Sequence, residues 1–199
     1  NKINLGTMRS VIQSVRHHYD ECINCTASTS SYNPASDKEL STVLNGLKFI
    51  PPLSGGVITS PYGPRTPPSL GNGSTGSAFH PGVDIGRSDA NGAQIVASES
   101  GTVVDTFYDA SGGYFVLIDH GNGVLTQTLD LQSVTVQKNT KVKKGQQIGT
   151  LGLVNGQVPS FETGLHVHWE IRTGANYPSS KGATRDPIAI LKAQGNGIA

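Results

Sequence analysis

Three features are missing or scarce in the sequence: a basic excess, a long apolar run and cysteine. Each shortage argues against a class of partner or site. The 199 residues carry a formal net charge of only +1. A nucleic-acid-binding surface normally shows a clear basic excess, so we expect no nucleic-acid partner. No apolar run approaches the ~20 residues that cross a bilayer, so we expect no membrane span in this chain. Cysteine is the third shortage, with two residues in the whole chain.

These two cysteines, Cys22 and Cys25, lie together in the segment CINC. A thioredoxin-like redox site would need a strand-helix-strand context, which the surrounding sequence does not have. The pair is therefore interpreted as a local disulfide or two idle thiols, and an external compartment would allow the disulfide. A zinc site that combines the pair with His17 or His18 is the remaining alternative.

Glycine is abundant, and together with proline it points to a fold class. The chain has 25 Gly and 11 Pro, which suits a turn-rich β protein better than a helical bundle. Asn122-Gly123 is a tight-turn signal between two strands. Short β-like runs recur along the chain, and their close spacing predicts a mainly β fold, a compact antiparallel sheet, sandwich or barrel. The expected strands lie in residues 56–60, 94–98, 101–109, 114–120, 123–131, 141–152 and 166–172.

The first quarter of the chain has a different residue pattern, without the short β-like runs. Residues 7–24 carry apolar side chains at helical spacing, with Thr7 as an N-cap, so we expect a short N-terminal helix there. The polar segment TASTSSYNPAS then reads as a linker, and residues 37–49 add a turn of helix. We accordingly expect an N-terminal helix and linker over 1–50 and a β domain over 51–199.

The segment LHVHWEI, residues 165–171, carries the first chemical signal. Side chains two residues apart on a strand share a face, so His166, His168 and Glu170 lie on one side. The apolar residues that alternate with them face the core. Two imidazoles in register on a polar face suggest a metal-binding or catalytic role.

A second signal is FHPGVDIG, which contains His80 and Asp84. In an extended strand these residues would be ~13 Å apart, too far for one ion, but Pro81-Gly82 is a turn signal that can bring them together. With one of the later histidines they make three protein ligands and an open fourth position, as in catalytic zinc sites. If both later histidines bound the ion, the closed shell would indicate a structural site.

At this point the sequence resembles a known family. HPGVD and TGLHVHWEI look like the His-x-Gly-x-Asp and His-x-His signatures of lysostaphin-type (LytM-like) zinc endopeptidases. The resemblance extends over residues 53–192 through ITSPYGPR, GAQIVASESGTVV, VLIDHGNGV, KVKKGQQIGTLG and RDPIAIL. It implies a small antiparallel β fold, one zinc ion, and cleavage of peptide stems or cross-bridges in bacterial peptidoglycan.

Carried over position by position, the resemblance makes His80, Asp84 and His168 the zinc ligands. His166 matches the histidine of the His-x-His pair that does not bind the ion. That histidine acts as the general base on the water that the zinc activates.

One departure from the family pattern concerns the other side of the zinc. The family normally carries Tyr-x-His-Leu after the HGNG turn, whereas this chain reads TQTLDL, with Thr128 at the tyrosine and Asp130 at the histidine. A charged Asp130 would repel a developing oxyanion, and loss of one such stabiliser typically costs ~100- to 1,000-fold in rate. Asp130 can alternatively accept a proton, and His120 is a weaker candidate to replace the missing histidine.

Two hypotheses of function follow. The first is a zinc endopeptidase of the cell wall, outside the cytoplasm, in a secreted, wall-associated or virion-borne protein such as a phage tail protein or endolysin. Its N-terminal segment would then contact assembly partners. The second is a degenerate, non-catalytic domain that binds wall or partner proteins. Two long loops, 66–78 and 153–164, are expected to wall the substrate cleft, and Glu162 in the second is a candidate contact for a positively charged peptide end.

Overall fold

The computed structural model describes residues 42, 44–69, 73, 75–109, 113–158, 164–196 and 198. All of them belong to the second of two compact units, Asp37–Ala199. The expected helix over 7–24, the Cys22–Cys25 pair and Glu162 lie outside the described residues, so these expectations stay predictions.

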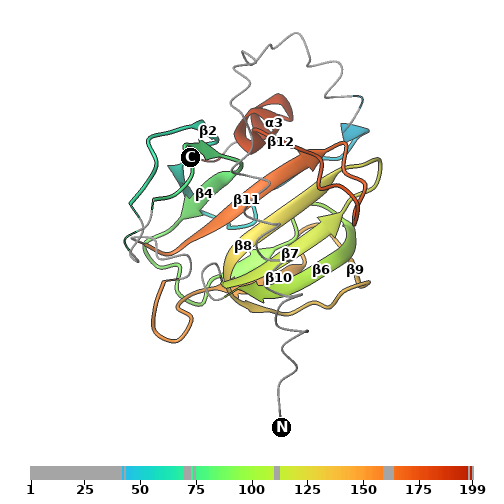
Figure 1. Ribbon diagram of the computed structural model, residues 1–199. Helices are drawn as coiled ribbons and strands as arrows, with labels where there is room; N and C mark the ends of the chain where they lie inside the picture. Colours follow the sequence, from blue (N-terminus) through green and yellow to red (C-terminus); the bar gives the residue numbers. More distant parts are fainter. Residues whose placement is uncertain are drawn as a thin grey trace, which may run out of the picture. The chain divides into compact units, whose positions relative to one another are not determined.

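Most of the regular secondary structure of this unit consists of antiparallel strands (Figure 1). The main path of the large sheet runs β1 (Val57–Ser60), β4 (Val83–Gly86), β11 (His166–Thr173), β8 (Leu125–Val134), β7 (Gly113–Asp119), β6 (Gly101–Asp109) and β9 (Lys141–Val142). Off this path, β10 (Gln147–Leu151) pairs with β5 (Gln94–Val96) and β8, and β12 (Ala183–Arg185) pairs with β11. A separate ribbon joins β2 (Gly63–Pro64) to β3 (Phe79–His80).

The prediction of a mainly β, antiparallel fold is confirmed. Each of the seven expected runs contains a strand, and the run over 141–152 contains two, β9 and β10. Strand β4 was not expected as a strand, although all four of its residues belong to the FHPGVDIG segment. It pairs with β11, so β11 lies between β4 and β8 in the sheet (Figure 1).

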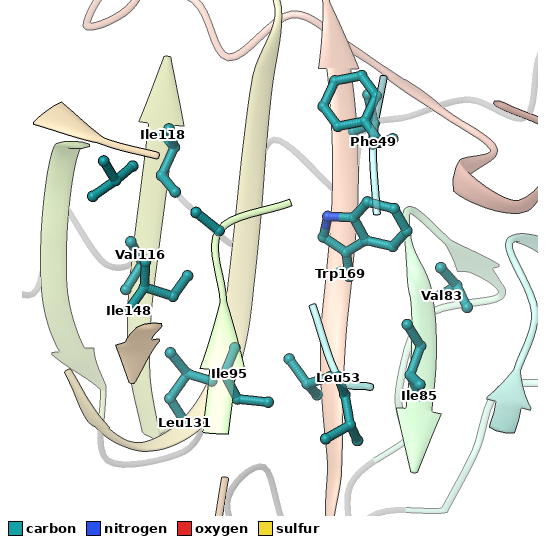
Figure 2. Packing of buried hydrophobic residues seen from close by; sticks show 14 of the residues in the cluster. Phe49, Leu53, Val83, Ile85, Ile95, Val116, Ile118, Leu131, Ile148 and Trp169 are labelled. Carbon is teal, nitrogen blue, oxygen red and sulfur yellow. The ribbon is translucent and has the colours of Figure 1, made fainter. Parts of the chain in front are cut away.

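The hydrophobic core fixes the orientation of β11. Val167, Trp169 and Ile171 are fully buried, as the alternation predicts. In Figure 2 the Trp169 ring lies among side chains from several segments, with Val83 and Ile85 of β4 on one side. Full burial of side chains of this size contributes about 1.5–3 kcal/mol each. Because these residues face the core, the intervening histidines must face the other way.

Helix α3 (Pro187–Ala193) lies near the C-terminal end of the chain. The Asp186 side chain accepts hydrogen bonds from the backbone N–H groups of Ile188 and Ala189, and Pro187 occupies the first turn. A capping aspartate followed by proline is a standard helix start. Ile190 and Leu191 are buried in the core. Within the part of the chain that the structure describes, no helix has the length and apolarity needed to cross a membrane.

Strand β8 contains an irregularity at Asp130. From Val116 to Tyr114 on β7 there are two residue steps, whereas their partners Thr128 and Leu131 on β8 are three steps apart. The extra residue is a β-bulge. Asp130 has a φ of 65°, in the left-handed region, and the bulge interrupts the alternation of side chains along β8.

Candidate metal centre

His80, Asp84 and His168 come together in one cluster. Their candidate ligand atoms all lie within 4.8 Å of one another. His80 Nε2 is 2.9 Å from His168 Nδ1, and these two nitrogens are 3.1 Å and 2.9 Å from Asp84 Oδ1. Asp84 and His168 are directly opposed in the pairing of β4 with β11. The sequence prediction that these three residues meet therefore agrees with the geometry.

The segment between His80 and Asp84 makes this meeting possible. His80 ends β3 and Asp84 lies in β4, and the chain bends at Pro81-Gly82 between the two strands. Gly82 is also in close approach to β11. A Cβ atom at this position would lie 2.5 Å from the Trp169 carbonyl oxygen and 2.7 Å from His168 Nε2. Glycine at this position therefore leaves room for the His168 ring.

The donor set fits zinc. Two imidazole nitrogens and a carboxylate oxygen are zinc ligands, and Zn–N bonds of ~2.0–2.1 Å at tetrahedral angles place ligand atoms about 3.3 Å apart. The observed separations are slightly shorter than this. The second nitrogen of each histidine is also occupied. His80 Nδ1 donates to the Pro61 carbonyl at 2.8 Å, and His168 Nε2 donates to Glu170 Oε1 at 3.1 Å. Such outer contacts orient metal-binding imidazoles.

Charges are balanced around the cluster. Asp84 Oδ2 lies 3.9 Å from the Arg65 guanidinium, which also donates to the Ser60 hydroxyl. Burial alone would raise the pKa of the Asp84 carboxyl, but the hydrogen bonds and charges of the neighbouring histidines lower it. Burial likewise opposes protonation of His168, yet the carboxylates of Asp84 and Glu170 raise its pKa to about 10.

His166 lies beside the cluster, with its Nε2 directed at two carboxylates. Its Nδ1 donates to the Gly164 carbonyl at 3.0 Å. Its Nε2 is 3.9 Å from Asp84 Oδ1 and 3.4 Å from Asp130 Oδ2. Burial disfavours the imidazolium, but Asp130 and Asp84 together raise the pKa of His166 to about 9. Asp130 is therefore the direct neighbour of His166, and its side chain is 8% exposed.

Two other residues considered in the sequence lie away from the metal cluster. His120 bonds through Nδ1 to the Ser100 carbonyl at 2.9 Å and through Nε2 to the Thr126 hydroxyl at 2.8 Å. It also makes an edge contact with Phe49. These contacts give His120 a structural place. Thr128 is buried opposite Trp169, on the core side of the sheet.

Sequence reasoning gave no role to three charged residues around the cluster. They are Arg65, next to Asp84, and the Glu170–Arg172 pair next to His168. The alternation along β11 places Glu170 and Arg172 on the face of His168, and that signal was available in the sequence. Nothing local in ITSPYGPR indicates that Arg65 reaches Asp84.

Comparison with known proteins finds a family match over the region that contains the metal cluster. Residues 78–186 match the sequence profile of "Peptidase family M23". The chain is 38% identical over 91 residues to the stage II sporulation protein Q of Bacillus subtilis, which covers 46% of this chain and 31% of that protein. It is 37% identical over 94 residues to the peptidoglycan DD-endopeptidase ShyA of Vibrio cholerae, covering 47% of this chain and 20% of the other. The chain thus spans less than a third of the length of either curated relative.

A solved structure shares the fold. The structure of the SpoIIQ–SpoIIIAH pore-forming complex contains a chain that is 26% identical, with a TM-score of 0.58. The similarity covers 72% of this chain and 90% of that chain. The expected resemblance to lysostaphin-type domains is confirmed by the family match, whereas these similarities lend no support to the expected phage-tail association.

Proposed function

Because the chain belongs to peptidase family M23, we propose that it is a zinc-dependent endopeptidase that hydrolyses peptide bonds of bacterial peptidoglycan, in the stem or the cross-bridge. The observation that carries the proposal is the His80–Asp84–His168 cluster with His166 directly beside it. The similarity to the endopeptidase ShyA supports peptidoglycan as the substrate class and a site of action outside the cytoplasm.

In this proposal His80, Asp84 and His168 hold the zinc, through Nε2, a carboxylate oxygen and Nδ1. When bound, zinc supplies Lewis-acid chemistry, since it activates water and polarises a carbonyl group. The chain supplies proton transfer. Nδ1 of His166 is fixed on the Gly164 carbonyl, so Nε2 is the nitrogen that is turned toward the cluster. When zinc is bound, its positive charge would offset the two carboxylates that raise the pKa of His166, and the neutral ring is then placed to take a proton from the attacking water and to return one to the leaving amine.

Asp130 is proposed to act together with His166. With 3.4 Å between the carboxylate and Nε2, Asp130 orients the ring and stabilises its positive charge after it has taken a proton. Asp130 also occupies the position where the family resemblance led us to expect a histidine. The stabilisation that this histidine would give to an oxyanion is therefore missing. We therefore expect a lower catalytic rate than in a family member that carries the histidine.

A second candidate is a non-catalytic domain that keeps the metal site and binds a partner. Two observations favour it. Asp130 brings negative charge to the side of the site where an oxyanion would develop, and the similar SpoIIQ chain was solved in a pore-forming complex with SpoIIIAH. In this case the retained ligand cluster would stabilise the fold rather than activate water.

Digestion of purified peptidoglycan separates the two candidates. The zinc-loaded protein should release new amino termini from at least one wall chemotype, in an assay that includes several. A chelator or the substitution His166→Ala should abolish the release. Stoichiometric zinc binding without release from any wall would instead support the binding domain.

A further inference from the structure

Glu170 and Arg172 extend the metal cluster by a line of polar contacts along β11. His168 Nε2 lies 3.1 Å from Glu170 Oε1, and Arg172 Nε donates to Glu170 Oε2 at 2.6 Å. The Glu170 side chain is 3% exposed, and the Arg172 side chain 15%. Charged groups are rarely buried this deeply unless they are paired. One carboxylate oxygen of Glu170 thus contacts the candidate zinc ligand His168, and the other accepts from the Arg172 guanidinium.

We propose that Glu170, held in turn by Arg172, is a positioning residue that fixes the His168 ring with Nδ1 toward the metal. The inference rests on the proposed metal site and assigns residues that the ligand set does not include. An imidazole can present either nitrogen, and a carboxylate on one of them selects the other for the metal. Glu170 accepts from Nε2, which leaves Nδ1 at 2.9 Å from both Asp84 and His80.

Arg172 has a separate part in this arrangement. A carboxylate at this depth would be costly by itself, and the guanidinium offsets that cost. It donates to the oxygen that His168 does not use, which keeps the plane of the carboxylate fixed. The positions follow from strand geometry, since residues 168, 170 and 172 share one face of β11.

Gly82 supplies the space for the same contact. A Cβ atom there would lie 2.7 Å from His168 Nε2 and 2.9 Å from Glu170 Cγ. The turn that brings His80 and Asp84 together therefore also passes against the His168–Glu170 contact. The close approach requires glycine between the two ligands, whereas the backbone at Gly82 is not in the left-handed region.

The test is zinc affinity, measured by competition with a chromophoric chelator. Glu170→Gln keeps the shape of the side chain and removes its charge, and we expect the zinc dissociation constant to rise about 10- to 100-fold. The matched control is Glu99→Gln. Glu99 is also paired with a cation, Lys144 at 2.8 Å, and accepts hydrogen bonds from the backbone N–H groups of Lys48 and Ser100, and none of these three partners belongs to the metal cluster. Its substitution should leave zinc affinity unchanged.

Nuclear magnetic resonance of the zinc-loaded protein reports which ring nitrogen of His168 carries the proton, a property that a loss of stability alone would not change. Long-range 1H–15N correlations should show the proton of His168 on Nε2 in the wild type and in Glu99→Gln, and a mixed or broadened ring pattern in Glu170→Gln. If Glu170→Gln does not fold, Arg172→Lys takes its place, with an expected several-fold weaker zinc binding.

The outcomes are distinguishable. Wild-type protein that binds no zinc overturns the proposed metal site and this inference with it. Wild-type protein that binds zinc, together with a Glu170→Gln variant of equal affinity and unchanged His168 ring signals, overturns only the positioning role. The same holds if Arg172→Lys has to be used and binds zinc as the wild type does.

Discussion

The carboxylate of Asp130 lies 3.4 Å from Nε2 of His166, on the side of the ring that faces the metal cluster. Asp130 reaches this position because the bulge in β8 adds one residue to the strand. In a regular strand residues 128 and 130 would share a face, and Thr128 is on the core side. The bulge therefore turns the Asp130 carboxylate from the core toward His166.

The first prediction concerns this pair. Asp130→Asn keeps the shape of the side chain and tolerates the left-handed backbone, but it removes the charge beside His166. We expect peptidoglycan hydrolysis to fall by roughly 10-fold or more, since positioned proton transfer contributes ~10²–10⁴ in rate. The measurement is the initial rate of amino-terminus release at saturating zinc. An Asp130→Asn variant that hydrolyses peptidoglycan as fast as the wild type would show that the Asp130 charge has no part in catalysis.

The second prediction concerns removal of the metal. The three ligands come from β3, β4 and β11, and His80 and His168 are 88 positions apart in the sequence. Zinc that binds only the folded chain should stabilise it by ~2.7 kcal/mol at a free concentration of 100 Kd. Unfolding by heat, with zinc and then with excess chelator, checks this. His80→Ala should show no zinc-dependent rise in Tm, and an equal rise would exclude His80 as a ligand.

A third prediction concerns Gly82. Gly82→Ala places a methyl group 2.5 Å from the Trp169 carbonyl and against His168 Nε2, so β4 and β11 must separate. We expect a lower Tm and markedly weaker zinc binding. The control is Gly164→Ala, because an added Cβ at Gly164 meets no atom of the described residues within 4 Å. Equal zinc affinity in the two variants would contradict the close approach.

The fourth prediction concerns pH and His120. Burial lowers the pKa of the His120 imidazole from its usual value of 6.5, although the Ser100 carbonyl opposes the change. As the pH falls below 6.5 the unfolded chain therefore takes up a proton here before the folded chain does, so stability is lost. His120→Gln should remove this component. Urea unfolding of both proteins at pH 7.5 and 5.5, with chelator present, should show the larger loss in the wild type; parallel losses would refute it.

Much of the fold could be predicted from the sequence because it depends on short-range patterns, whereas the choice of His168 over His166 as the third candidate ligand came from the family resemblance. The alternation in residues 165–171 predicted which side chains of β11 enter the core, and Pro81-Gly82 predicted the bend between two ligands. The contact between Asp130 and His166 could not be predicted, because alternation assumes a regular strand and nothing in TQTLDL indicates an extra residue. The support of Asp84 by Arg65 likewise depends on tertiary packing.

The backbone at Asp130 also limits which residues can replace it. Its φ of 65° is a conformation in which, apart from glycine, Asn, Asp and His are several-fold enriched, whereas bulky or β-branched residues are strained. The histidine expected from the family pattern and the aspartate found here both belong to this short set. Substitution between a ring and a carboxylate therefore requires no rebuilding of the strand. Relatives with the same scaffold can diverge in chemistry at this one position while their folds remain alike.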